Sequence, residues 1–299
     1  MISDRLLEIV RPVTEPCECR GEDPRCPCGG SGLSWRREPS ATYISPSRVS
    51  LLASCPRKYW WRYIKQFEVP TPAPLIYGGA VQAALVHGTH VLDQPSRFGV
   101  TDPAEGEWLR LWGTRVVEAY KEKFEPNGPP EGLEVPLAVK LADPTEMTPG
   151  GVWLICRADG IDGTDLIENK LVSAIREWDP HSDLQTMALR LAAREMGLEI
   201  RRVRYRQTRK PRKPPQFDEA ALRTAAAYKP VCDEQTAELS PEDPALDELH
   251  ETLVQWAAIL AAHGSTHMWP ANLSACTQYG KCEYYGVCRM GEVEHKEHA

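Results

Sequence analysis

The sequence predicts an α/β protein whose core is a mixed β-sheet flanked by helices. Apolar residues recur at helical spacing between positions 107 and 124, and three apolar segments between 133 and 172 have the pattern of strands. A further helical segment and a fourth strand follow them. The order helix, three strands, helix, strand favours a single sheet with parallel and antiparallel neighbours.

The first helices are expected after a cysteine-rich N-terminal stretch. Ser45 supplies a capping hydroxyl and Pro46 is preset for a first helical turn, so one helix begins here and restarts at Pro56. The N-terminal part of the core is therefore helical. The next expected elements are a helix over residues 77–92, a loop over 93–107 and a helix over 107–124.

The predicted strands are bounded by glycine, proline and aspartate. They are the segments LEVPLAVKL, VWLICRADGI and TDLIENKLV, followed later by IRRVRYRQT. Further helices are expected over residues 182–196, between the third and fourth strands, and then near 217–227 and 246–263.

The composition is that of a globular protein, with 42% hydrophobic and 26% charged residues and a net charge of −7. This acidity argues against a protein that coats nucleic acid through its overall charge, but it allows a local basic patch. No stretch reaches the roughly 18 apolar residues of a membrane helix, and Asp4, Arg5 and Glu8 argue against a signal peptide. We therefore expect a cytoplasmic protein without membrane association, in which ten cysteines favour metal binding over disulfides.

Asp159, Glu168 and Lys170 form the most informative group of charged residues. Asp159 ends one predicted strand, and Glu168 and Lys170 lie two residues apart on the next, where they share a face. A tight turn around Gly163 could fold Asp159 beside Glu168. Two carboxylates in one cleft suit Mg²⁺ or Mn²⁺, and a neighbouring lysine can orient or help deprotonate a water, as phosphodiester hydrolysis requires. The alternative is a set of ordinary surface charges near a hairpin.

The residues DGID that start at Asp159, followed by LIENK, resemble the central motifs of PD-(D/E)XK nucleases, and in particular RecB-like members. The resemblance spans about residues 43–290 and implies a restriction-endonuclease-like core. It implies that Asp159 and Glu168 bind the metal, that Lys170 is catalytic, and that Gln185 in SDLQTMALRLAA helps to orient the site. The family often has a tyrosine four residues after this glutamine, where the present chain has Leu189.

The segment GGAVQAALVHG resembles the first motif helix of the same nucleases, which typically carries a histidine metal ligand. Gly79 matches the glycine of that motif and Gln82 stands in place of the histidine. A glutamine oxygen can still bind a hard cation, directly or through water, so Gln82 is a candidate third ligand. Two alternatives remain: His87 or His90 takes this role in another register, or the helix supplies no ligand.

A dense basic stretch, IRRVRYRQTRKPRK, follows the proposed site in this acidic chain. Phosphate contacts are the natural use of such a stretch. The candidate DNA-binding residues are Arg204, Arg206, Arg209 and Lys210. The alternative is an edge strand whose charges protect it from aggregation.

Three late cysteines, Cys276, Cys282 and Cys288, are separated by five residues each, which is wider than paired zinc ligands prefer. This spacing suits a [4Fe–4S] cluster held by four thiolates, with Cys55 as the candidate fourth ligand. One early and three late cysteines resemble the iron–sulfur nucleases related to AddAB and to the CRISPR adaptation exonuclease, in which the cluster pins the first helix to the C-terminal segment. Free buried thiols or a zinc site are the alternatives.

The N-terminal cysteines Cys17, Cys19, Cys26 and Cys28 form the pattern C-x-C-x6-C-x-C. Four thiols this close together suggest one tetrahedral Zn²⁺, and the alternative is an appendage whose thiols bind nothing. The expected organisation is a cysteine-rich segment over residues 1–40, a nuclease domain with an iron–sulfur staple over 41–290 and a flexible tail over 291–299.

The combined prediction is a metal-dependent DNA nuclease of prokaryotic or phage origin. We expect an exonuclease that acts on single strands or ends in recombination, repair or phage DNA processing, beside a recombination or helicase partner. The alternative is a non-catalytic DNA-binding or adaptor protein with a degenerate site, which Gln82 and Leu189 keep open.

Overall fold

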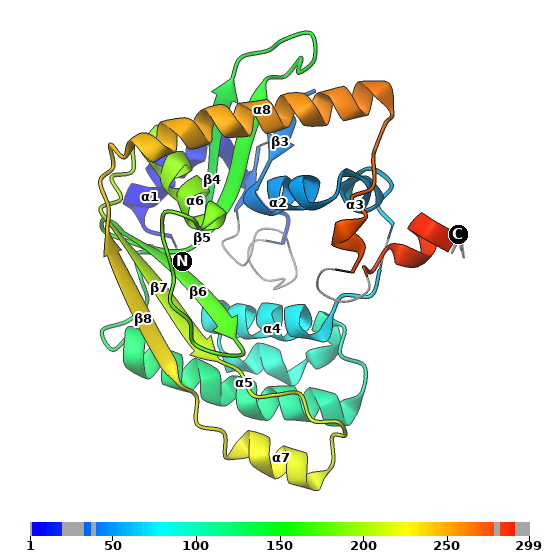
Figure 1. Ribbon diagram of the computed structural model, residues 1–299. Coiled ribbons are helices and arrows are strands. Elements are labelled where there is room, and N and C mark those ends of the chain that lie inside the picture. The colour runs from blue at the N-terminus through cyan, green and yellow to red at the C-terminus, as the bar shows by residue number, and fades with distance from the viewer. Residues whose placement is uncertain (1, 20–32, 37–39, 68, 278–281, 291–299) are drawn as a thin grey trace.

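The computed structural model describes residues 2–19, 33–36, 40–67, 69–277 and 282–290. Its centre is a mixed sheet in which β3, β5, β6, β7 and β8 are neighbours in that order and β4 pairs with the other edge of β5 (Figure 1). These strands are β3 (Thr42–Ile44), β4 (Gly132–Ala142), β5 (Val152–Asp162), β6 (Asp165–Val172), β7 (Arg202–Arg209) and β8 (Cys232–Glu238). A separate antiparallel pair joins β1 (Thr14–Pro16) and β2 (Leu33–Trp35).

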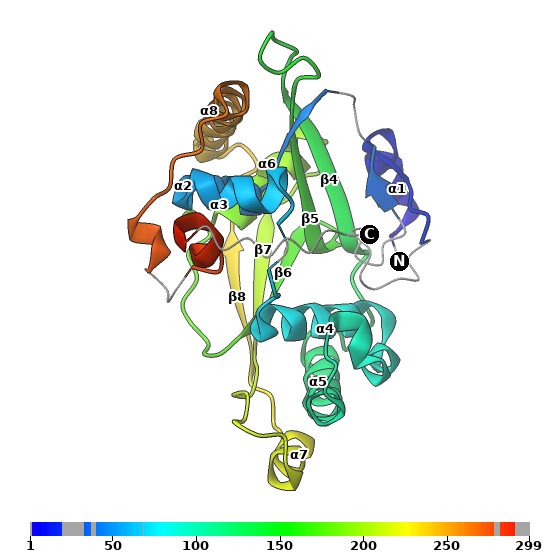
Figure 2. The same cartoon turned by 90° about the vertical axis from the view of Figure 1, so that its right-hand side faces the viewer.

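Helices lie on both sides of this sheet. They are α1 (Asp4–Val10), α2 (Pro46–Ser54), α3 (Pro56–Tyr59), α4 (Ala73–His87), α5 (Pro103–Phe124), α6 (Leu184–Glu195), α7 (Glu219–Ala226) and α8 (Pro244–Thr266). In the two perpendicular views, α2, α6 and α8 lie at one end of the molecule and α4 and α5 at the other, with α7 beyond α5 (Figures 1 and 2). The predicted class, a mixed sheet flanked by helices, is confirmed.

The sheet is mixed because its connections differ. A tight turn at Gly163, whose φ of 58° suits glycine, joins β5 to β6 as antiparallel neighbours. The helix α6 then carries the chain from β6 to β7, and these two strands are parallel, as a crossover helix allows. The strand pairing therefore places the C-terminal end of β5 beside the N-terminal ends of β6 and β7.

Two hydrophobic cores flank the sheet. One packs α6 and α8 on β4 and β5, and there Leu137, Leu154 and Leu189 are fully buried. The other joins α4, α5 and α7 around the buried Trp112. Leu189 stands where the family resemblance expects a tyrosine, and in this chain it belongs to the first core and contributes no hydroxyl.

The observed elements differ from the predicted ones in several places: α1, β1 and β2 were not predicted, and α5 begins at Pro103, inside the expected loop. The helix expected over residues 77–92 begins at Ala73 and ends at His87, because Gly88 leaves the helical conformation with a φ of 97°. The short strand β3 was not predicted. The strand β8, which begins at Cys232, was also missed. Its sequence CDEQTAE lacks the apolar alternation of a strand, since it is a charged edge strand that needs little burial.

The N-terminal helix α1 is attached to the β5–β6 turn through Glu131. This carboxylate accepts hydrogen bonds from Ser3 Oγ at 2.6 Å, Arg5 Nη2 at 2.6 Å and the backbone N–H of Gly163 at 3.3 Å. The hydrogen bond from Arg5 is the main reason why the pKa of Glu131 falls to about 2. A carboxyl whose pKa is lower in the folded state stabilises the fold at neutral pH and loses that contribution on acidification.

Replacing Glu131 with glutamine is therefore expected to lower the free energy of unfolding at pH 7 by roughly 1 kcal/mol, a value reduced for the solvent exposure of Arg5. The difference from wild type should hold above about pH 4.3, the ordinary glutamate pKa, and shrink as pH falls toward 2. Urea unfolding at several pH values measures this. Glu118→Gln, at an exposed ion pair within α5, is the control, and an equal loss in both variants would contradict the prediction.

Candidate active site

The candidate site forms where β5 and β6 separate. The ladder between them ends at the pair Gly160↔Ile167, so the next opposed residues are Asp159 and Glu168. Beyond that point the backbone N–H of Asn169 donates to the side chain of Asp159, at 2.7 Å from its Oδ2 atom. Where Asp159 and Glu168 face each other, the backbone pairing between β5 and β6 is therefore replaced by a hydrogen bond to the Asp159 side chain.

Glu168, Lys170 and Gln185 form one hydrogen-bonded group. Glu168 and Lys170 share a face of β6, as the period of two predicts, and the Lys170 ammonium donates to Glu168. Lys170 Nζ also lies 2.9 Å from Gln185 Oε1, while Gln185 Nε2 donates to Glu168 Oε1 at 2.6 Å. Gln185 comes from the first turn of α6, where Asp183 caps the helix by accepting from the Thr186 N–H. The structure therefore brings these three predicted residues together.

A third carboxylate, Glu134, joins this group and was not predicted. The ladder between β4 and β5 pairs Leu133 with Gly160 and Val135 with Ala158, which sets Glu134 opposite Asp159. Glu134 is buried and has a φ of 53°, uncommon for a side chain other than glycine and often found at functional sites. Its charge inside the apolar segment LEVPLAV is the signal that could have revealed it.

Gln82 reaches this row of carboxylates from α4. Its Nε2 donates to Glu134 Oε1 at 2.7 Å, so the amide nitrogen faces the carboxylate. His87 lies five residues further on, about 140° around the helix, and His90 lies beyond the end of α4. The helix therefore directs Gln82 toward the site in the register that matches Gly79, and not either histidine.

Burial and mutual repulsion raise the pKa values of the carboxyl groups of the site. Burial, followed by the charge of Asp159, raises the pKa of Glu168 to about 8 and that of Glu134 to about 7, although Lys170 and Gln82 respectively oppose these shifts. Burial also raises the pKa of Asp159. For Lys170, burial lowers the pKa, but Glu168 and Asp159 raise it by more. Lys170 is therefore an ammonium at neutral pH.

The donor set fits a hard divalent cation that keeps part of its water. Among the residues that the structure describes, no three His, Cys, Asp or Glu side chains converge as a ready-made metal site. Mg²⁺ commonly uses only one or two protein carboxylates together with water and substrate phosphate, and Asp159 and Glu168 supply two. Glu168 Oε2 is buried and lacks a hydrogen-bond partner in the described structure. A cation would compensate this buried oxygen, which otherwise costs about 1–3 kcal/mol.

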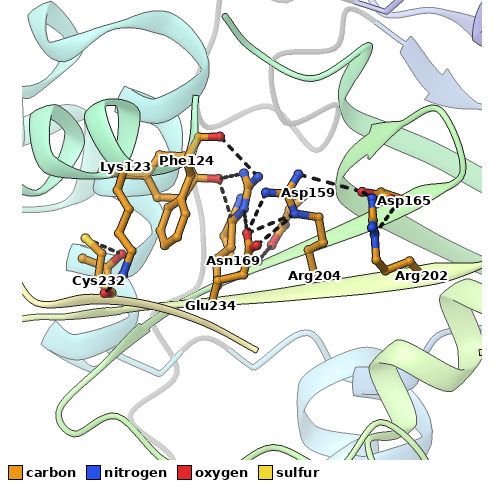
Figure 3. Close-up of polar contacts among 12 residues, drawn as sticks. Lys123, Phe124, Asp159, Asp165, Asn169, Arg202, Arg204, Cys232 and Glu234 are labelled. Atoms are coloured by element: carbon orange, nitrogen blue, oxygen red, sulfur yellow. Dashed lines mark hydrogen bonds and ion pairs between the residues drawn. The ribbon is translucent and has the colours of Figure 1, made fainter. Parts of the chain in front are cut away.

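The basic side chains of β7 pair mainly with acidic residues of the neighbouring strands β6 and β8 (Figure 3). Arg206 is only 2% exposed, and its guanidinium donates to Glu234 at 2.8 Å and to the Tyr120 hydroxyl at 2.7 Å. Arg204 also pairs with Glu234, at 3.1 Å. The strand β7 turns Arg206 inward, where it also lines the cavity beside Asp159, so its predicted contact with DNA stays a prediction. Arg204 is partly exposed, Arg209 is exposed and Lys210 is half-buried at the end of the strand, so these three remain candidates.

The structure brings the early and late cysteine segments together. Cys55 is buried between α2 and α3, and the backbone N–H of Asn272 lies 3.4 Å from its Sγ atom. Nearby, Lys58 forms an ion pair with Glu283 at 2.9 Å. The backbone N–H of Cys282 donates to the carbonyl of Cys276 at 2.9 Å. This packing agrees with a C-terminal segment held on the first helices, although the described residues contain no group of three metal ligands.

The predicted zinc site is only partly within the described residues. Cys26 and Cys28 lie outside them, and the sulfur atoms of Cys17 and Cys19 are 3.5 Å apart. The zinc assignment therefore stays a prediction, as do the predicted tail over 291–299 and the domain boundaries.

Comparison with known proteins agrees with the geometry. The model of the PD-(D/E)XK nuclease superfamily matches residues 43–289, a range that includes the three carboxylates, Lys170 and Gln185. No curated protein matches the chain. In the described part of the chain, no helix has both the length and the apolar character needed to span a membrane. The match covers most of the chain, and the chain belongs to the PD-(D/E)XK nuclease superfamily.

Proposed function

We propose that this protein is a nuclease that hydrolyses DNA phosphodiester bonds with Mg²⁺ or Mn²⁺. The observation that carries the proposal is the opposition of Asp159 and Glu168 at the split between β5 and β6, with Lys170 bonded to Glu168. Asp159 and Glu168 would hold the cation, which supplies charge neutralisation for the phosphate and acidifies a bound water.

The remaining side chains would position the reactants. The charges of Glu168 and Asp159 raise the pKa of Lys170, so its ammonium would hold the attacking water or a phosphate oxygen by donating a hydrogen bond. Gln185 fixes both Lys170 and Glu168 through its amide. Gln82 acts through Glu134, since its amide nitrogen is engaged with that carboxylate. We assign Glu134 as the additional acidic group that takes the place of the missing histidine.

The finer activity that we propose is exonucleolytic action on single strands or ends, in recombination, repair or phage DNA processing, with a helicase or recombination protein as partner. Arg209 and Lys210 would contact the phosphates of the DNA. Their position at the end of β7, which follows β6 in the sheet, supports this assignment.

The proposal is tested by degradation of end-labelled single-stranded and duplex DNA with Mg²⁺ or Mn²⁺. Wild type should cleave, and Asp159→Asn and Glu168→Gln should each lose about a thousandfold in rate, since each removes a carboxylate that would hold the cation. Asp162→Asn, which changes an exposed residue of the same hairpin, is the matched control. Folded wild type that binds DNA but cleaves none with either metal would favour the non-catalytic adaptor.

Replacing Gln185 with alanine is expected to lower kcat about 10- to 100-fold, because groups that orient catalytic ligands typically contribute that much. Lys170 and Glu168 would keep each other but lose the amide that fixes their position. Single-turnover cleavage rates measure the effect, and thermal melting checks the fold. A rate within threefold of wild type would remove Gln185 from the site.

We propose in addition that Cys55, Cys276, Cys282 and Cys288 hold a [4Fe–4S] cluster. The support is the packing of the C-terminal segment on residues 54–58, where Asn272 Nδ2 donates to the Ser54 carbonyl at 2.8 Å. Arg57 Nε donates to the Trp269 carbonyl at 2.6 Å in the same contact. Such a cluster would act as a structural cross-link between distant parts of the chain and not as a redox catalyst.

A further inference from the structure

A half-open cavity of 360 Å³ adjoins the candidate active site. Asp159 and Lys170 of the proposed reaction centre line it, and Gly78, Gly79 and Gln82 belong to the wall that α4 forms. Aliphatic side chains from α4, α5 and β6 make much of the remaining surface: Val81, Leu85, Val116 and Leu171. A ligand in this cavity would therefore contact both the reacting groups and apolar surface.

The α4 wall contains two consecutive glycines, Gly78 and Gly79, in the interior of a 15-residue helix. Each glycine costs a helix interior about 1 kcal/mol relative to alanine. In α5 this cost has a packing reason, since a Cβ on Gly106 would lie 2.6 Å from Pro95. A Cβ on Gly78 or Gly79 would meet nothing within 4 Å. The bare backbone therefore faces open space, which suits close approach by a ligand.

We propose that this cavity takes the unpaired base of the nucleotide next to the scissile phosphate, so that the protein cleaves single strands in preference to duplex DNA. This inference rests on the proposed nuclease function. The volume lies near the lower end of the roughly 300–1,000 Å³ of small-ligand pockets, which fits one nucleotide and not a base pair. A base inside a duplex must first leave its stack, at a cost of a few kcal/mol that a single strand largely avoids.

The polar lining of the cavity fits a base and its adjacent phosphate. Asn169, whose Oδ1 accepts from Tyr120, offers its amide N–H to the edge of a base, and Thr208, whose hydroxyl donates to Cys232 Sγ, can still accept. Lys210 lines both this cavity and a neighbouring hollow of 570 Å³, so its ammonium is placed where a phosphate between two nucleotides would pass. Trp178 and Tyr205 border the second hollow as a stacked pair with ring centroids 4.6 Å apart, which offers an aromatic surface to the next base.

The test combines a protein variant whose cavity is filled with a DNA substrate that lacks one base. Gly78→Leu would place a side chain into the cavity without a clash inside the protein, and leucine favours helix more than glycine does. Gly264→Leu, at a helical glycine of α8 that also has nothing within 4 Å of its Cβ position, is the matched control. The substrates are single-stranded oligonucleotides with an intact terminal nucleotide or an abasic one, at the 5′ end in one pair and at the 3′ end in another.

For wild type and Gly264→Leu, an abasic nucleotide at one of the two ends should lower kcat/KM roughly ten- to a hundredfold, the effect of one lost base contact. Gly78→Leu should lower kcat/KM for the intact oligonucleotide by a similar factor and should no longer distinguish intact from abasic ends. Wild type that ignores the missing base at both ends, or a variant that slows both substrates equally, would overturn the proposal.

A binding measurement distinguishes failure of this inference from failure of the proposed nuclease function. Fluorescence anisotropy with Ca²⁺ in place of Mg²⁺ measures affinity for the same oligonucleotides without requiring cleavage. If wild type cleaves nothing but binds the intact end more tightly, and Gly78→Leu abolishes that difference, the nuclease proposal fails and the base cavity stands. If cleavage is normal and neither rate nor affinity depends on the base, the cavity proposal fails alone.

Discussion

Replacing Lys170 with alanine is expected to lower kcat for DNA cleavage by about a thousandfold, while DNA affinity changes little. The ammonium lies against Glu168 and 2.9 Å from Gln185 Oε1, and its raised pKa keeps it charged at neutral pH. One preorganised donor that stabilises developing charge typically contributes about 10²–10³ in rate, and positioning of the water adds to this. The variant also leaves the buried carboxylate of Glu168 with one partner fewer.

Single-turnover cleavage of a labelled single strand, with DNA affinity measured in Ca²⁺, distinguishes the chemical step from binding. Lys170→Arg keeps the charge but changes its geometry, so it should recover only a small part of the rate. Lys140→Ala removes a strand lysine that pairs with Asp143 outside the site and serves as the matched control. A loss confined to affinity, with kcat unchanged, would assign Lys170 to DNA binding and not to the reaction.

Replacing Cys55 or Cys282 with serine is expected to remove the iron and to destabilise the fold by about 5 kcal/mol. The estimate treats the cluster as a cross-link that closes a loop of more than two hundred residues between Cys55 and the late cysteines. For a chain of this size, such a loss lowers the Tm by roughly 10–15 °C. Anaerobically purified wild type should be brown, and both variants should be colourless.

Iron and zinc analysis together with thermal melting measures this outcome. Cys232→Ser, at the first residue of the edge strand β8, is the matched control and should keep the colour, the iron and the Tm. Colourless wild type that carries one zinc in place of iron would replace the cluster by a zinc site. Serine variants of Cys55 and Cys282 that melt like wild type would show that the contacts of Trp269, Asn272 and Glu283 with residues 54–58 need no metal.

The central elements were predictable because their signals are local. The helix α5 and the strands β4, β5 and β6 were predicted to within a few residues from apolar spacing and from the glycines and prolines that bound them. The edge strand β8 was not predictable from its sequence, because it is polar along its length. It forms because β7 offers it a pairing partner. Likewise, Arg206 is basic in sequence but buried in structure, since its contacts with Glu234 and Tyr120 bring together residues far apart in the chain.

By itself, the sequence indicated the family and the β5–β6 hairpin. Spacing within that hairpin predicted Asp159, Glu168 and Lys170 as candidate site residues, because it sets which side chains share a face, and the family resemblance added Gln185. Only the tertiary structure decided that Glu134 lies opposite Asp159 and that Gln82 donates to it. Those contacts depend on strand register and on how α4 packs across the sheet. Both arise from interactions between distant segments, which no local pattern encodes.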